Sequence, residues 1–308
     1  MNCSAVIPVY KGQATLPALI ERLEAVRASL SEKYEMILVN DGSPDQSWDV
    51  ILSLAEKYPH VRGIDLLRNY GQHNATLCGI LAAQYEVIIT LDDDLQHPPE
   101  EIPNLLAKLA EGYDVVYGVP RRRPHSWWRN SFSVLAKFVL SYVMGIPTVR
   151  DIGSFRAFRA RLRKSFEKFN CPDVIVDVLL SWGTHRFSVV QVSESPRTTG
   201  TSNYSFFKLV RLVLIILTAF STAPLRLASI TGFLFMLMGI GVFVYVLIIY
   251  FSAGSIPGFP FLASLISIFS GAQLFALGII GEYLARIFDR TATRPCFTVG
   301  QTTGEPFA

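Results

Sequence analysis

Residues 87–98 read VIITLDDDLQHP, an apolar run that ends in three consecutive aspartates. Val, Ile and Thr favour β structure, so the run predicts a buried strand with polar residues at its carboxyl end. Other short apolar runs alternate with segments in which apolar residues recur at helical spacing. The runs lie at 4–9, 36–39, 61–66, 87–91 and 115–117. This alternation predicts an α/β domain with a mostly parallel sheet covered on both faces.

The composition excludes several classes of protein. Half of the 308 residues are hydrophobic, 17% are charged, and the net charge is only +3. These values argue against a disordered chain, a collagen-like repeat and a basic nucleic-acid-binding module. The mean hydropathy of +0.34 is high, and the excess is local, because residues 227–281 contain no Asp, Glu, Lys, Arg or His.

The uncharged stretch is long enough for two membrane-spanning helices. Turn-forming residues near 252–260 divide it into segments at about 229–251 and 261–285, each long enough for a hydrocarbon core of about 30 Å. A short connector implies a hairpin whose flanks lie on one side, and Arg226 and Arg286 put that side in the cytoplasm. We therefore expect a multi-pass protein of the inner (plasma) membrane with a cytoplasmic catalytic body. A buried hairpin in a soluble protein is the alternative.

Two further segments have the character of membrane-interface helices. Trp127 and Trp128 stand among basic residues, and the apolar run after them predicts an amphipathic helix at about 126–145. Core packing is the alternative for this helix. A second amphipathic helix is expected at 206–226. The predicted organisation is a body at 1–205, this juxtamembrane helix, a hairpin at 227–285 and a cytoplasmic tail at 286–308.

The aspartate run itself points to a metal site. Packed carboxylates repel one another and are tolerated mainly where a cation neutralises them. Asp92 and Asp94 can both reach one Mg²⁺ or Mn²⁺ that also holds a diphosphate, at the strand edge where such sheets bind ligands. No G-x-G-x-x-G follows the first run, and no P-loop motif occurs in the sequence. A nicotinamide-dependent Rossmann enzyme and a P-loop NTPase are therefore disfavoured.

Taken together, the motifs resemble those of the polyprenyl-phosphate glycosyltransferases of family 2, which have the GT-A (Rossmann-like) fold. This group includes dolichol-phosphate mannose synthase and the GtrB-type and ArnC-type undecaprenyl-phosphate transferases. The matching stretches are VIPVY (6–10), NDGS (40–43), RNYGQH (68–73), LDDDLQHPPEEIP (91–103), GTSNYS (200–205) and GEY (281–283).

The resemblance implies roles for the residues at the strand ends. Pro8 and Tyr10 would line the pocket for the base and ribose, and Asp41 would bind one of these. Asp94 and Gln96 would hold the metal directly, with Asp92 acting through the metal shell or the nucleotide. Asp93 takes the place of a residue that is commonly Ala in the family, and we assign it with Asp92 to the nucleotide-sugar site.

The resemblance also implies which residues would act on the acceptor, the lipid phosphate. A lipid phosphate is already anionic, so it needs cations more than it needs a base. Asp151 is the candidate for a general base or for orienting an arginine, and 197–204 resembles a loop that closes over the substrates. The catalytic candidates are Asp151, Arg156, Arg121, Arg122 and Arg197. The candidates for the acceptor phosphate are Arg121, Arg123, Arg129, Ser154 and Ser202.

The implied activity is a metal-dependent, inverting transfer of a sugar from a nucleotide sugar to undecaprenyl phosphate, with a UDP-sugar favoured over a GDP-sugar. The resemblance also implies a homo-oligomer, which would be a tetramer. No nucleic-acid partner is expected. One alternative is a processive polysaccharide synthase, although no Trp follows an Arg as that class requires. A non-catalytic membrane scaffold is the other. The sequence leaves the sugar itself open.

Overall fold

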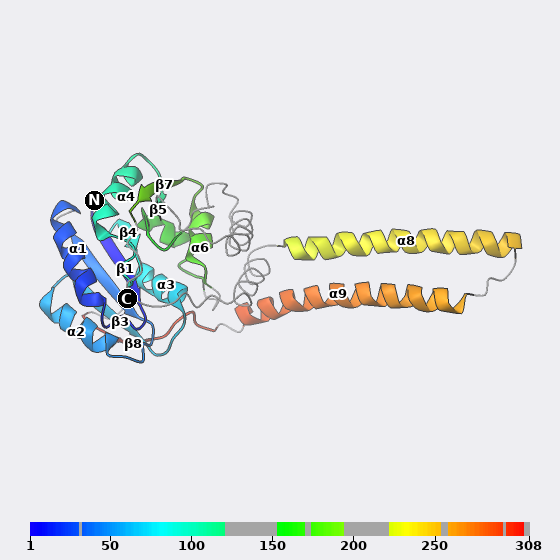
Figure 1. The fold of residues 1–308 in the computed structure, drawn as a ribbon, viewed down its shortest axis with the longest axis horizontal. Helices are drawn as coiled ribbons and strands as arrows, with labels where there is room; N and C mark the ends of the chain where they lie inside the picture. Colours follow the sequence, from blue (N-terminus) through cyan, green and yellow to red (C-terminus); the bar gives the residue numbers. More distant parts are fainter. Residues whose placement is uncertain are drawn as a thin grey trace. The chain divides into compact units, whose positions relative to one another are not determined.

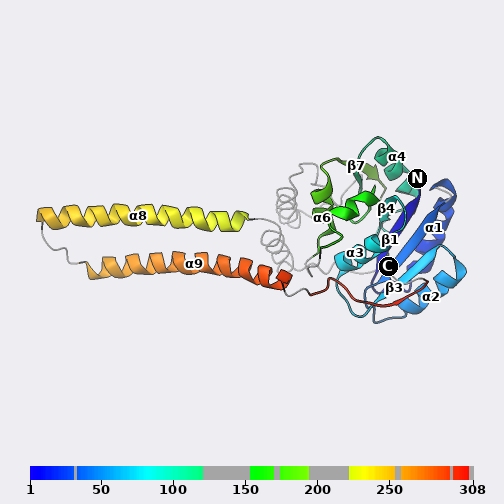
Figure 2. The ribbon, with the colours of Figure 1, turned by 180° about the vertical axis from the view of Figure 1, so that it is seen from behind.

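The computed structural model describes residues 1–30, 33–120, 153–169, 174–193, 222–253, 258–291 and 294–304. The expected interface helix at 126–145 lies outside these ranges, as does most of the one expected at 206–226. The chain divides into two compact units, Met1–Val210 with Thr293–Ala308, and Arg211–Ala292. Figures 1 and 2 show the ribbon from opposite sides.

The first unit is built on an eight-stranded sheet with the order β7-β5-β6-β4-β1-β2-β3-β8. The mostly parallel sheet predicted from the sequence is confirmed: β1 pairs in parallel with β2 and β4, β2 with β3, and β5 with β7. β6 and β8 run antiparallel to their neighbours. The strands are β1 (Cys3–Val9), β2 (Tyr34–Asn40), β3 (Val61–Leu66), β4 (Val87–Thr90), β5 (Val115–Pro120), β6 (Arg156–Arg159), β7 (Phe187–Val192) and β8 (Val299–Thr302).

Helices cover both faces of this sheet (Figure 1). Alternate residues of β1, from Cys3 to Val9, share one buried cluster with apolar side chains of α1, α2 and α4, and α3 packs on β1 and β2. Strands buried on both faces have to be apolar throughout, which explains their continuous apolar runs. The helices are α1 (Leu16–Leu30), α2 (Ser47–Lys57), α3 (Gln72–Ala82), α4 (Ile102–Ala110) and α6 (Val176–Gly183), with 3-10 turns at η1 (Pro99–Glu101) and η3 (Ala160–Ser165).

Strand β6 lies between β4 and β5 and carries Arg156, one of the catalytic candidates predicted from the sequence. The Arg156 side chain is only 2% exposed and forms an ion pair with Asp177. Its Nε donates to Thr90 Oγ1 at 3.0 Å, and the Tyr117 hydroxyl donates to Asp177 at 2.9 Å. Arg156 is therefore buried in the interior, and Asp177 supplies the counter-charge that a buried charge requires. The catalytic role of Arg156 stays a prediction.

The last residues of the chain return to the first unit. β8 pairs with the edge of β3, and the Leu67 N–H donates to the Thr298 carbonyl at 3.1 Å. Thr303 exchanges two bonds with Gly63, accepting its N–H through Oγ1 at 2.6 Å and donating to its carbonyl at 2.9 Å. The end of the chain, expected to be a tail at 286–308, thus contains a strand that covers an otherwise open sheet edge.

The second unit contains two long antiparallel helices, α8 (Ala223–Ala253) and α9 (Phe259–Thr291). They lie side by side in both views (Figures 1 and 2), with Phe235 and Phe269 in edge-to-face contact at 5.9 Å. The segments Pro224–Ile249 and Ile268–Ala285 are long and apolar enough to cross a membrane, with mean hydropathies of 2.6 and 1.4. The predicted pair of apolar helices is therefore present, and large apolar side chains remain exposed along it.

Loss of the Asp177 carboxylate is expected to destabilise the first unit. Asp177→Ala leaves the Arg156 guanidinium buried without its counter-charge, which costs about 3–5 kcal/mol for buried pairs of this kind. Chemical denaturation of the purified full chain, followed by tryptophan fluorescence, measures the free energy of unfolding. Asp49→Ala removes an exposed carboxylate and should change that energy by no more than about 0.5 kcal/mol. Equal stability of the two variants would contradict the expectation.

Candidate active site

The polar residues at the carboxyl ends of β1, β2 and β4 meet at one edge of the sheet. The strands are parallel and adjacent, so Tyr10, Asp41 and the 92–94 run are brought together although they are far apart in sequence. Tyr10 is 46% exposed at this edge. Pro8 lies within β1 opposite Val39 and is buried.

Asp41 organises the loop that follows β3. Its side chain is buried, and its two carboxylate oxygens accept the backbone N–H groups of Tyr70 at 2.7 Å and Gly71 at 2.9 Å. Burial raises the pKa of Asp41, and these two N–H groups oppose the rise. Gly42 has a φ of +58°, and a Cβ there would lie 2.4 Å from the carbonyl carbon of Arg68. The two loops therefore approach so closely that only glycine fits.

Asp92 is held from two sides. Gln72 Nε2 donates to Oδ1 at 2.6 Å, and Ser154 Oγ donates to Oδ2 at 2.5 Å. The Ser154 carbonyl in turn accepts the Thr90 hydroxyl at 2.6 Å, and Thr90 also receives the bond from Arg156. Burial raises the pKa of Asp92, and the bond from Ser154 opposes this effect. A chain of contacts thus connects the buried Arg156 to this carboxylate.

Asp93 accepts a hydrogen bond from the residue that follows β1. Its Oδ2 accepts the Tyr10 backbone N–H at 3.2 Å. Burial raises the pKa of Asp93 to about 7; the Tyr10 N–H opposes the rise, and the charges of Asp92 and Asp94 add to it. The middle aspartate of the run therefore connects β4 to the Tyr10 segment.

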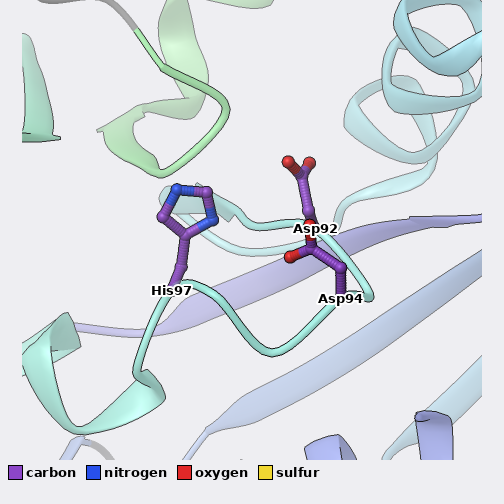
Figure 3. Close-up of side chains that lie close together, drawn as sticks. All are labelled: Asp92, Asp94 and His97. Atoms are coloured by element: carbon purple, nitrogen blue, oxygen red, sulfur yellow. The ribbon is translucent and has the colours of Figure 1, made fainter. Parts of the chain in front are cut away.

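Asp92, Asp94 and His97 form a group whose side chains lie close enough together to hold a metal ion. One possible ligand atom from each lies within 4.8 Å of those of the other two, and Figure 3 shows the imidazole facing the two carboxylates. Asp94 Oδ1 accepts the Gln96 backbone N–H at 3.1 Å, and Leu95 between them has a φ of +62°. The loop therefore turns tightly enough to bring His97 back towards the aspartates.

The donor set of this group fits a hard divalent cation. Carboxylate oxygens are the ligands preferred by Mg²⁺ and Mn²⁺, and an imidazole nitrogen is a softer ligand that suits Mn²⁺ better than Mg²⁺. His97 stacks on Phe155 with ring centroids 5.3 Å apart. Its Nδ1 is buried and has no hydrogen-bond partner within the described ranges. His97 was not among the ligands predicted from the sequence, although its position directly after Gln96 in the same loop was the available signal.

The remaining predicted residues divide into two groups. Ser154 lies beside Asp92, and Gln96 lies half-buried in the loop between Asp94 and His97. The others fall outside the residues that the structure describes: Arg121, Arg122, Arg123, Arg129, Asp151, Arg197 and Ser202. The structure thus brings together the acidic half of the expected site.

Solved structures share this fold at low sequence identity. Glucosyl-3-phosphoglycerate synthase from Mycobacterium tuberculosis matches 70% of this chain and 78% of its own, with 18% identity and a TM-score of 0.52. A structure of the same enzyme in complex with Mn²⁺, UDP and glucosyl-3-phosphoglycerate has 18% identity and a TM-score of 0.51, over 70% of this chain and 77% of its own. These likenesses support the GT-A fold of the first unit.

Sequence relatives match nearly the whole chain. An undecaprenyl-phosphate 4-deoxy-4-formamido-L-arabinose transferase from Shewanella sediminis (strain HAW-EB3) is 40% identical over 96% of this chain and 91% of its own. One from Proteus mirabilis (strain HI4320) is 36% identical over 98% and 94%. Residues 4–167, which include the sheet edge with Asp41, Asp92 and Asp94, match the profile of glycosyl transferase family 2. The chain belongs to glycosyl transferase family 2.

Proposed function

We propose that the protein transfers a sugar from a nucleotide sugar, with a UDP-sugar favoured, to undecaprenyl phosphate at the cytoplasmic face of the membrane. The observation that carries this proposal is the Asp92–Asp94–His97 group at the carboxyl edge of a family 2 sheet. Relatives at 36–40% identity are named for transfer of 4-deoxy-4-formamido-L-arabinose to undecaprenyl phosphate. Their sugar is therefore the first donor to test.

We propose that Asp94 and His97 hold Mg²⁺ or Mn²⁺, with Asp92 and the predicted ligand Gln96 beside them. The hydrogen bonds from Gln72 and Ser154 occupy one lone pair on each oxygen of Asp92. This supports a role for Asp92 through the metal shell or the nucleotide rather than as the main ligand. When bound, the cation neutralises the leaving diphosphate. A structural neighbour contains Mn²⁺ together with UDP, which makes Mn²⁺ a reasonable first choice.

The nucleotide would lie against the loops that Asp41 and Asp93 hold in place. Asp41 orders the Tyr70–Gly71 segment, and Asp93 holds the Tyr10 backbone. Tyr10 is half-exposed at the same edge and is available to stack on a base or ribose. The proposed donor site is thus built from buried carboxylates that shape the loops and from an exposed aromatic ring that meets the ligand.

The acceptor needs little general acid–base catalysis. A phosphate oxygen of the lipid attacks the anomeric carbon while the bond to the diphosphate breaks, which inverts the configuration without removal of a proton from the nucleophile. Bringing two anions together requires cations, for which Arg121, Arg122, Arg123, Arg129 and Arg197 stay the candidates. Asp151 would orient one of them, and Ser154 and Ser202 would contact the phosphate.

The two apolar helices support a membrane setting for this reaction. An enzyme that acts on a long polyprenyl chain has to meet its substrate at the bilayer, and α8 and α9 are each long enough to span it. The basic residues on the flanks of the hairpin support a cytoplasmic position for the first unit. A tetramer remains a prediction from resemblance.

Membranes that contain the full chain should transfer label from a nucleotide sugar to undecaprenyl phosphate when Mg²⁺ or Mn²⁺ is present. Asp94→Ala should lower the rate by about 100-fold or more, because several kcal/mol of charge stabilisation are lost. Asp49→Ala, which removes an exposed carboxylate, should leave the rate unchanged. Product analysis by thin-layer chromatography separates a lipid-linked monosaccharide from a polysaccharide. Full activity of Asp94→Ala would contradict the metal assignment, and long products would favour the processive alternative.

Ser154→Ala tests how Asp92 is positioned. Loss of a hydrogen bond to a charged group should reduce kcat/KM by about tenfold, and Ser53→Ala, at an exposed site on α2, serves as control. A higher metal concentration needed for half-maximal rate would indicate that Ser154 acts through Asp92. A change confined to the KM for the lipid would instead indicate direct contact with the acceptor phosphate.

A further inference from the structure

A cavity lined by charged side chains lies at the amino ends of strands β4 and β5, opposite to the ends that carry Asp92 and Asp94. It has a volume of about 390 Å³, and Arg159, Arg161 and Arg186 line it together with Glu86 and Asp114. Glu86 and Asp114 directly precede β4 and β5, whereas Asp92 follows β4. The cavity is therefore separated from the candidate active site by the length of the strands, and the proposed sugar transfer does not use it.

Asp114, one of the two carboxylates that line this cavity, is already paired with an arginine. Asp114 is buried and accepts bonds from Arg161 at 2.5 Å and from the Thr184 hydroxyl at 2.8 Å. Burial opposes its ionisation, but the bonds from Arg161 and Thr184 hold the pKa of Asp114 below its ordinary value. Glu86 is exposed and accepts the Asn2 backbone N–H at 3.3 Å.

Two guanidinium groups of the cavity, those of Arg159 and Arg186, are not in direct contact with its carboxylates, although the charge of Arg186 helps to lower the pKa of Asp114. Arg159 donates to the Leu109 carbonyl at 3.3 Å, and the Arg186 side chain is exposed. Across the ranges that the structure describes, neither forms an ion pair with a carboxylate. Three guanidinium groups thus face two carboxylates, one of them fully engaged, and the balance favours an anion.

The backbone makes room for this arrangement. Gly112 has a φ of +104°, and a Cβ there would lie only 3.0 Å from Arg186 Nη2. The guanidinium therefore lies directly over the turn between α4 and β5. A planar guanidinium can donate two parallel hydrogen bonds to one phosphate group, which a single ammonium cannot match.

We propose that this cavity binds a phosphate-bearing anion through Arg159, Arg161 and Arg186. The binding group is a phosphate or diphosphate, which a soluble molecule or an anionic lipid headgroup could supply. The site does not depend on the metal and is distinct from the Asp92–Asp94–His97 group. Its test is therefore independent of whether the proposed sugar transfer is correct.

The test measures binding of inorganic diphosphate to the full chain in neutral detergent with EDTA, by isothermal titration calorimetry. Arg186→Gln should weaken binding by about tenfold or more, because a charge-assisted contact is lost. Arg186→Lys should retain part of the affinity. Asp94→Ala disables the candidate metal site and should bind diphosphate as the unaltered chain does. Lys168→Gln removes an exposed positive charge outside the cavity and should also leave binding unchanged.

A second arm identifies the source of the phosphate. Native mass spectrometry counts phosphatidic acid molecules that bind from doped micelles, with phosphatidylcholine as the reference lipid. Arg186-dependent binding of diphosphate supports a soluble ligand, and Arg186-dependent binding of phosphatidic acid alone supports a lipid headgroup. If Arg186→Gln binds both probes as the unaltered chain does, or if neither probe binds, the proposal is overturned.

Discussion

Three successive carboxylates at the end of β4 repel one another, and the residues at the carboxyl ends of the strands are arranged so that they hold these carboxylates in place. Each has a different partner: Asp92 is held by Gln72 and Ser154, Asp93 by the Tyr10 backbone, and Asp94 by the backbone of its own loop. The partners come from β1, α3 and the segment before β6, so the charges draw distant parts of the chain to one point. Such a cluster is tolerated where a cation completes it.

The support for this cluster extends into the interior. Arg156 is buried on β6 beside Asp177, and it reaches Asp92 through Thr90 and Ser154. A buried ion pair is a costly way to stabilise a core, and an apolar pair often does as well. Here the pair also has directional contacts, because Arg156 donates to Thr90, and Thr90 donates to the carbonyl of Ser154.

The sequence predicted the parallel strands β1 to β5 and the acidic run, but it missed the parallel strand β7 and other features. β4 was recognisable because VIIT is β-branched throughout and ends in charges. β6 was missed because RAFR lacks such a run, and its arginines look like surface residues until Asp177 is placed beside one of them. β8 was missed because VGQT is short and is paired on one side only. His97 joined the site only through the turn at Leu95.

The sequence by itself determined the class of the fold, the acidic edge and the two apolar helices, because these depend on local patterns of apolar and charged residues. Only the tertiary structure decided what each charge does. Asp41 orders a loop, Arg156 lies in the interior, and three arginines gather at the amino ends of β4 and β5, although all of them look alike as isolated polar residues. The physical reason is that the effect of a charge depends on its burial and on its partners, and the strand order sets both.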